Sequence, residues 1–364
     1  MQKKEVLNIL TGNAFLYYCF DVGTHIDLNN AETRLGSSAQ RAGLIIERLT
    51  PSAVHYRKNP LLVRLGQRKI TNSYTLEITA KLYDFGVITI RVRAPLHGVL
   101  DNKLCMSLQN NKHLNAAAKA AFEEIHTKLA DAIERPYELT EAFEDYTIVH
   151  IERFSRNIKA SELFSHHATE IARLLRCEGQ PLSHQELNDA IKNPLSYYDD
   201  DLVVIDTGAA FVYYPRHEYD VNDVIEYAII RLLELRHYDG VLDGVLEQAH
   251  KDISATTLRL RPYSQLHRQL AHVRVQVTNT VEKVENALKL IGDSYLAKIY
   301  DAAADRFGLK TWKDSVREKL TTLQETYAML TERIQSRRLM MLEVVIAISS
   351  VIFIIDFVWR YWKR

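Results

Sequence analysis

Residues 74–95 read YTLEITAKLYDFGVITIRVRAP, and this segment predicts a β-sheet in the first part of the chain. It has the pattern of two strands joined by a turn at residues 84–86, because Asp and Gly are typical turn residues. Residues 87–92 are rich in β-branched side chains, which favour strands, and we expect Pro95 to end the second strand. The apolar residues of the first strand do not alternate cleanly, so we expect a β-bulge in it.

Further strands are expected on both sides of this segment. They share short apolar runs, rich in β-branched and aromatic residues, that end at turn residues. The runs are NAFLYYCF (13–20), GLIIERL (43–49), PLLVRLG (60–66), YTIVHIERF (146–154) and DDLVVIDTGAAFVYY (200–214). Helices are expected at 114–134, 161–176 and 183–191, the last opened by a capping box of Ser183 and Glu186. These elements predict an α+β domain, a mixture of sheet and helix, at residues 1–215.

After Pro215 the apolar spacing becomes helical and stays so. Apolar side chains that step by threes and fours predict a helical hairpin with coiled-coil packing. The expected seam residues are Leu266, Leu270, Val277, Leu320, Leu323 and Leu330. A short helix is expected at 293–306. The bundle covers residues 216–336, and its last helix continues without a proline or glycine into residues 337–364.

Residues 344–355 carry no charge and lie between Glu343 and Asp356. This run alone makes only about 18 Å of helix, which is shorter than a hydrocarbon core of about 30 Å. A helix over 339–359 is about 31 Å long, and both acids then lie about one turn from its ends, near the interface. Aromatic and basic residues flank the span, as is typical of membrane anchors. The expected anchor residues are Leu339, Glu343, Val344, Ile355, Asp356, Trp359 and Trp362. The alternative is a buried helix in the core of an oligomer.

Composition indicates where the protein resides. The formal net charge is zero, so no global electrostatic field indicates a nucleic-acid partner. The three cysteines are scattered without metal-ligand spacing, which favours a reducing compartment over a disulfide framework. The first residues lack the apolar core and the cleavage site of a signal peptide. We therefore expect a single-pass protein of the inner (plasma) membrane whose N-terminal domain lies in the cytoplasm.

Motifs for catalysis are sparse. Residues 206–208, Asp-Thr-Gly, resemble the signature of aspartic proteases, which need two aspartates that share a proton. The chain has one such tripeptide, so we expect a turn there, and a hydrolase that uses Asp206 is the last alternative. Residues 84–86 resemble the metal-binding tripeptide of protein kinases, but no glycine-rich loop precedes them. The histidines at 166 and 167 match no metal-ligand spacing. We expect no catalytic, cofactor-binding or metal-binding residue and no small-molecule substrate.

The charge distribution suggests an alternative function. Lys and Arg far outnumber Asp and Glu between residues 48 and 93, whereas acids dominate between 123 and 153. The two segments could pair within one fold. The alternative is a basic sheet face that binds RNA or a ribosome. The expected binding residues are Arg57, Lys58, Arg64, Arg68 and Lys69.

Several segments resemble one known family. AFLYYCFDVGTHIDLNNAETRL (14–35) resembles the opening strand of the required-for-meiotic-nuclear-division family, and LYDFGVITI (82–90) resembles another strand of that family. EYAIIRLLELRHYDGVLD (226–243) and RRLMMLEVVIAISSVIFII (337–355) resemble its helical hairpin and its anchor. The resemblance implies a membrane-anchored, non-enzymatic protein, and it supplies no catalytic residue. Mitochondrial members support organellar translation at the inner membrane.

The sequence therefore predicts a membrane-anchored scaffold or interaction protein. The expected partners are the lipid bilayer, further copies of the same chain through the coiled-coil seam, and a protein that the sequence does not identify. A membrane-tethered protein that binds RNA or a ribosome is the alternative.

Overall fold

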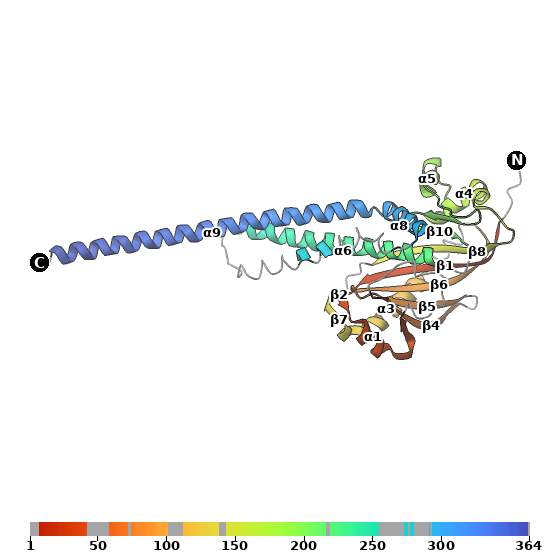
Figure 1. Ribbon diagram of the computed structural model, residues 1–364, viewed down its shortest axis with the longest axis horizontal. Helices are drawn as coiled ribbons and strands as arrows, with labels where there is room; N and C mark the ends of the chain where they lie inside the picture. Colours follow the sequence, from red (N-terminus) through yellow and green to blue (C-terminus); the bar gives the residue numbers. More distant parts are fainter. Residues whose placement is uncertain are drawn as a thin grey trace. The chain divides into compact units, whose positions relative to one another are not determined.

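The computed structural model describes residues 7–41, 58–71, 74–100, 112–137, 143–215, 219–254, 273–275, 277–279, 291 and 293–362. The structure is mixed α+β, as predicted, with a large sheet, helices around it and long helices in the C-terminal part (Figure 1). The chain divides into two compact units. The first unit comprises Met1–His237 and Thr280–Trp312, and the second comprises Tyr238–Asn279 and Lys313–Arg364. The domain limits expected at 215 and 336 stay a prediction.

Among the described residues, eight strands form one sheet in the order β3-β4-β5-β6-β1-β8-β10-β9. The strands are β1 (Asn8–Asp21), β3 (Ala39–Arg41), β4 (Leu61–Thr71), β5 (Tyr74–Leu82), β6 (Val87–Val99), β8 (Glu144–Phe154), β9 (Leu202–Ile205) and β10 (Ala209–Tyr213). All neighbours are antiparallel except β8 and β10, which run parallel. A two-stranded sheet pairs β2 (Gly23–Ile26) with β7 (Ile133–Pro136). The predicted strand at 43–49 lies outside the described residues.

The hairpin expected at residues 74–95 is present as β5 and β6, with its turn at 84–86. Two details of the prediction were wrong. Strand β6 continues past Pro95 to Val99. In the described residues its pairing with β5 ends at Arg93, so one edge of β6 needs no hydrogen bonds beyond that residue. A proline, which has no N–H to donate, is tolerated at such an edge. The pairing of β4 with β5 shifts between Arg64 and Gln67, so the extra residue lies on β4 and not on β5.

Helices on one face of the sheet enclose the aliphatic core. They are α1 (Leu28–Leu35), α3 (Lys112–Leu129) and α4 (Ala160–Arg176), with short 3₁₀ turns at Gly36–Ser38 and Ala130–Ala132, while α5 (His184–Ala190) packs on α4. Side chains of alternate β1 residues, such as Ala14 and Leu16, belong to this core together with Ile125 of α3 and Leu163 of α4. Because side chains alternate along a strand, the residues between them point to the other face.

Two long helices leave the sheet region, and each of them contributes to both units. Helix α6 (Asp220–Ser254) begins on the sheet, and α9 (Leu309–Trp362) follows α8 (Ser294–Arg306). In the second unit, Lys319 of α9 forms ion pairs with Asp239 and Asp243 of α6, at 2.9 and 2.7 Å. The two helices are therefore held side by side within this unit.

The structure describes only some of the residues of the predicted coiled-coil seam. Val277 and Leu323 are buried, and Leu320 is half-buried. Leu266 and Leu270 lie outside the described residues, and the side chain of Leu330 is not described. Coiled-coil packing therefore stays a prediction.

Candidate functional site

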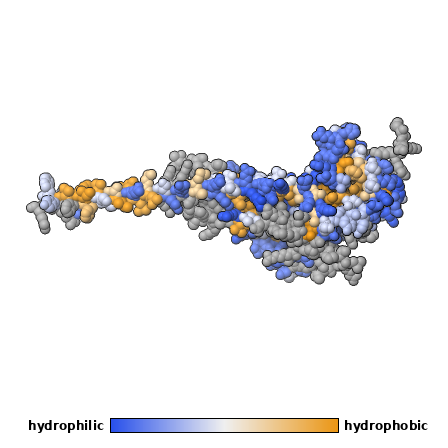
Figure 2. All heavy atoms as spheres, turned by 45° about the horizontal axis from the view of Figure 1, so that its top comes forward, coloured by the Kyte–Doolittle hydropathy of each residue, from blue (hydrophilic) through white to orange (hydrophobic). Residues whose placement is uncertain are grey.

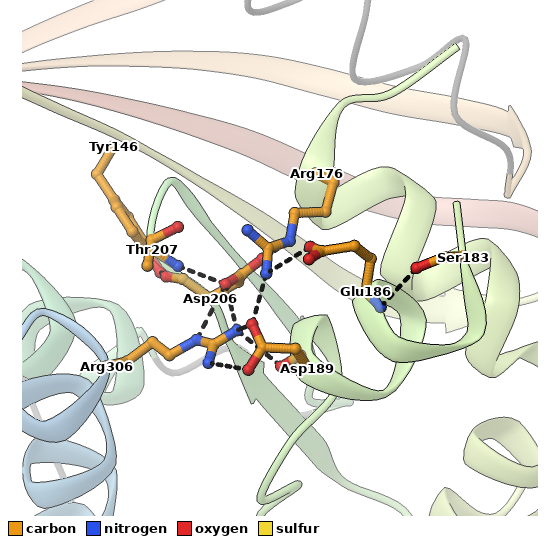
Figure 3. A network of polar contacts seen from close by, with 8 residues as sticks. All are labelled: Tyr146, Arg176, Ser183, Glu186, Asp189, Asp206, Thr207 and Arg306. Carbon is orange, nitrogen blue, oxygen red and sulfur yellow. Dashed lines mark hydrogen bonds and ion pairs between the residues drawn. The ribbon is translucent and has the colours of Figure 1, made fainter. Parts of the chain in front are cut away.

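Asp206 lies at the turn between β9 and β10, as predicted, and its side chain is fully buried. Its Oδ1 accepts hydrogen bonds from Nε and Nη2 of Arg306 in α8, at 2.9 and 2.6 Å, and from the backbone N–H of Thr207 at 2.7 Å (Figure 3). Its backbone carbonyl accepts a hydrogen bond from the hydroxyl of Tyr146 at 2.8 Å. The turn is thus held in place by contacts with both α8 and β8.

A second arginine and a second carboxylate complete this network. Nε of Arg176, at the end of α4, lies 2.9 Å from Oδ2 of Asp206, as an ion pair. Asp189 of α5 accepts bonds from Arg176 Nη2 at 2.6 Å and from Arg306 Nη2 at 3.0 Å (Figure 3). Glu186 lies 3.5 Å from Arg176 Nη2. Charged side chains therefore connect α4, α5, α8 and the β9–β10 turn at the edge of the sheet.

The geometry of this network argues for a structural role of Asp206. An aspartic hydrolase needs two carboxylates close enough to share one proton. Here Arg306 lies between Asp206 and Asp189 and donates to both of them. The two carboxylates are therefore joined through a guanidinium group and not by a shared proton, which is not the arrangement of a proton-sharing pair. The hydrolase hypothesis thus gains no support from the surroundings of Asp206.

The network also makes stability depend on pH. The hydrogen bond from Arg306 lowers the pKa of Asp189 below its ordinary value, and the charge of Arg176 adds to this effect. A carboxyl group with a lowered pKa in the folded state stabilises that state above its unfolded pKa, near pH 4, and loses this contribution as the pH falls through the folded value. We therefore expect Asp189→Asn to flatten the fall of the melting temperature below pH 4. Arg306→Gln should flatten it too, because it removes the main cause, and unchanged acid sensitivity in both variants would contradict the assignment.

A second buried polar cluster lies between the sheet and α6. Lys81 Nζ on β5 donates to Asp223 Oδ1 at 2.8 Å and to Glu226 Oε2 at 2.6 Å, and the hydroxyl of Tyr83 donates to Glu226 Oε1 at 2.9 Å. The side chain of Glu226 is 0% exposed and that of Lys81 is 11% exposed. Burial alone would lower the pKa of Lys81, but the charges of Asp223 and Glu226 outweigh it and raise that pKa. The ammonium group therefore stays charged inside the protein.

The expected basic face does not form a single surface in the part of the chain that the structure describes. Arg64 pairs with Thr79, on the sheet face that carries Lys81, whereas Arg68 pairs with Leu76 on the opposite face and lies 3.6 Å from Glu124 of α3. The extra residue near Gly66 reverses the alternation between the two arginines. Lys58 is exposed.

The other basic residues add little to such a surface. Arg57 lies outside the described residues, and the side chain of Lys69 is not described. Arg91 is half-buried and its Nε donates to Thr79 Oγ1 at 3.2 Å, and Arg93 lies 3.3 Å from Glu77. An RNA- or ribosome-binding face therefore stays a prediction. It would be tested by reversing the charges of Arg64, Arg68 and Lys69 and measuring the salt dependence of RNA binding.

The histidines at 166 and 167 do not mark a metal centre in the described residues, where no group of three or more His, Cys, Asp or Glu side chains could hold an ion. His167 is buried in α4. Cys19 and Cys177 are both free cysteines, and burial raises the pKa of Cys19 well above its ordinary value.

The apolar end of α9 is the most exposed hydrophobic feature of the described residues. Leu339–Asp356 has a mean hydropathy of 2.4, is long enough to cross a membrane, and buries none of its residues (Figure 2). The hydroxyls of Ser349 and Ser350 both donate to the backbone carbonyl of Ile346, at 2.9 and 2.8 Å. The hydroxyls of both serines are thus satisfied within their own helix.

Fold and site together define an α+β protein with one helix apolar enough to span a membrane. The chain belongs to the family described as "Uncharacterized protein MJ0711, N-terminal domain", which matches residues 11–220. It is similar to the uncharacterized protein MJ0711 of Methanocaldococcus jannaschii, with 21% identity over 229 residues that cover 60% of this chain and 70% of that protein. The family match covers the eight-stranded sheet and ends where α6 begins.

Sequence reasoning missed both charged networks. Arg306 is 100 positions from Asp206 and 117 from Asp189, and Lys81 is 145 positions from Glu226. Nothing in the local pattern links such residues. The one signal was the strongly basic stretch up to residue 93, together with the possibility that it pairs with acids of the same fold.

Proposed function

We propose that this protein is a single-pass membrane protein whose sheet domain is a non-enzymatic platform for other proteins. The exposed apolar segment of α9, which is continuous with the helix of the second unit, carries the proposal. The proposal has three further parts. The sheet domain lies in the cytoplasm, the protein resides in the inner (plasma) membrane, and copies of the chain assemble into oligomers through the helical seam.

The physical cost of the alternatives supports a bilayer as the surroundings of this helix. Side chains such as Ile348, Ile352 and Phe353 are 56%, 61% and 72% exposed. In water, the apolar side chains of this 18-residue segment would forgo the burial energy of roughly 25 cal/mol per Å² that drives folding and association. In a bilayer the same surface is in its preferred solvent, and Glu343 and Asp356 lie near the ends of the helix, where charges cost least.

A platform function is supported by the way in which the charged groups of the sheet are used. Lys81 and Asp206 are both engaged by oppositely charged side chains of the same chain, which suits a structural role. The resemblance to the required-for-meiotic-nuclear-division family implies a membrane-anchored, non-enzymatic protein as well. Both points favour an interaction protein over an enzyme.

The anchor can be tested by charge insertion. Ile348→Lys/Val351→Lys places two charges in the middle of the apolar run, and each costs roughly 2.5–3.5 kcal/mol at the centre of a bilayer. We expect the unmodified protein to stay in the membrane pellet after alkaline carbonate extraction, and both this variant and a chain lacking residues 339–364 to move to the supernatant. Thr322→Lys, which adds charge to an exposed position of α9 before the apolar run, should stay in the pellet. An unmodified protein that is extracted with the variants would refute the anchor.

Orientation and partners need separate measurements. Protease added to inverted membrane vesicles should degrade the sheet domain, whereas intact cells should protect it. A reversed pattern would refute the cytoplasmic orientation. Purification of the full chain in detergent, followed by chemical crosslinking with quantified mass spectrometry, would identify both self-association and a protein partner. If no crosslink formed between copies of the chain or to another protein, a platform function would be contradicted.

A further inference from the structure

The two faces of the sheet hold their helices by different means. On one face, aliphatic side chains such as Leu16, Ile78 and Val92 pack against α3 and α4 in the core. On the other face, the cross-strand row Lys81–Thr89–Cys19 is polar at two of its three positions, and all three side chains are largely buried. Helix α6, which begins at Asp220, packs on this second face through residues such as Asp223 and Glu226, and α8 packs beside β9.

Charged and polar side chains connect α6 to this face at two points along its axis. Asp223 and Glu226 both bind Lys81, and Glu226 also binds Tyr83. Asn222, the residue directly before Asp223, places its Oδ1 3.0 Å from Nδ1 of His150 on β8, and both residues are fully buried. Each contact is directional, because it needs the donor and the acceptor to be at one position.

The apolar side chains of α6 are less specific about position. Beside Asn222, Glu226, Tyr227 and Arg231, the buried residues of its first turns are small or medium aliphatic side chains. They are Val221, Val224, Ile225, Ala228, Ile229, Ile230 and Leu232. A helix moved by one turn, about 5.4 Å, would again present aliphatic side chains to the same surface. A packed surface tolerates the exchange of one aliphatic side chain for another of similar shape. Aliphatic packing alone therefore distinguishes only weakly between the observed position of α6 and a position shifted by one turn.

We propose that the buried charge cluster of Lys81, Tyr83 and Glu226 is a register lock that fixes α6 along its axis on the sheet. A buried ion pair often adds no net stability compared with apolar side chains of similar volume, because desolvation offsets its attraction. Its effect is to make one position of the helix much better than the others, since a shifted α6 would leave Lys81 or Glu226 buried without its partner. This is the use of buried ionic groups that is best established for packed helices.

Helix α6 offers a built-in reporter of its position. Arg236 Nη1 lies 2.7 Å from Glu144 Oε1 at the start of β8, and both residues belong to the first unit. Gly240 lies four residues further along α6, where an added side chain meets no atom within 4 Å. A shift of four residues, about 6 Å, would bring position 240 to the place that Arg236 occupies.

The experiment compares crosslinking rates in the full chain, purified in detergent, after Cys105 and Cys177 are replaced by serine. One cysteine pair is E144C/R236C, which reports the observed register, and the other is E144C/G240C, which reports the shifted one. A short bis-maleimide is the crosslinker. Each pair is measured with the cluster intact and in K81M/Y83F/E226L, where apolar side chains replace all three members. K81A/Y83F/E226A serves as the second variant where the longer side chains do not fit.

With the cluster intact, E144C/R236C should react at least about tenfold faster than E144C/G240C, which corresponds to about 1.4 kcal/mol between the two arrangements. In the apolar variant, the melting temperature should equal or exceed that of the unmodified protein, while the ratio of the two rates falls severalfold toward one. An unchanged ratio in a folded variant would overturn the register lock, because apolar packing and the contact of Asn222 with His150 would then fix α6. A ratio near one with the cluster intact would overturn it as well.

Discussion

Replacing Gly86 by alanine should unfold the first unit under conditions in which the unmodified protein is stable. Gly86 has a φ of +92°, and a Cβ built there would lie 1.7 Å from the carbonyl oxygen of Gly23. The backbone cannot give way easily, because Val22 N–H donates to the carbonyl of Gly86 at 2.9 Å. Strain at a positive φ costs about 1–3 kcal/mol, and overpacking adds a similar amount or more, so we expect a loss of about 4 kcal/mol or more.

Gly208→Ala is the matched control for this prediction. Gly208 also lies in a turn between two strands, but an added Cβ there meets no atom within 4 Å, and its φ is not in the left-handed region. It should therefore change the free energy of unfolding by less than about 1 kcal/mol. Urea denaturation of the full chain in detergent, followed by tryptophan fluorescence and circular dichroism, measures both variants. If the Gly86→Ala protein were as stable as the Gly208→Ala protein, the close approach of Gly86 to Gly23 would not be tight.

The second large effect is expected from Lys81→Met. This variant removes the cation that binds Asp223 and Glu226 and leaves Glu226, whose side chain is 0% exposed, with Tyr83 as a donor. Breaking a buried ion pair by removing one partner typically costs about 3–5 kcal/mol, because a charge stays buried without compensation. We expect a loss of stability in that range, measured by the same denaturation.

Two further variants separate burial from charge. Lys159→Met removes an exposed lysine that lies 3.1 Å from Asp199, and it should cost less than about 1 kcal/mol, as is usual for surface pairs. Adding Glu226→Leu to Lys81→Met removes the uncompensated carboxylate and should restore most of the lost stability. Equal losses for Lys81→Met and Lys159→Met, or a double variant less stable than Lys81→Met alone, would contradict this account.

The sequence predicts the elements around Gly86 well and their contacts poorly. The turn at 84–86 follows from local residue preferences, and the strands on each side follow from β-branched side chains. The positive φ of Gly86 belongs to the turn itself, but the close approach of Gly23, a residue of another strand, is revealed by no local pattern. Short-range chemistry therefore specifies the hairpin, whereas tertiary packing specifies which of its residues cannot change.

The basic stretch shows the same division more sharply. A regular alternation would place Arg64 and Arg68 on one face, and this assumption underlies the predicted binding surface. The shift of one residue near Gly66 sends them to opposite faces, and Lys81 is drawn into the interior by acids of α6. Where these charges lie depends on one added residue in β4 and on partners about 140 positions away. The periodicity of the sequence reveals neither of these.

The unbroken course of α9 has a mechanical consequence. From Lys319, which is fixed to Asp239 and Asp243, to Leu339 the helix contains neither proline nor glycine. At 1.5 Å per residue this stretch is a stiff shaft of about 30 Å. A tilt of about 10° at the apolar end then displaces the lysine clamp sideways by about 5 Å. In the proposed membrane-anchored state, the helix would transmit a change in bilayer thickness, or in the packing of the apolar segment, as a force on the ion pairs of Lys319.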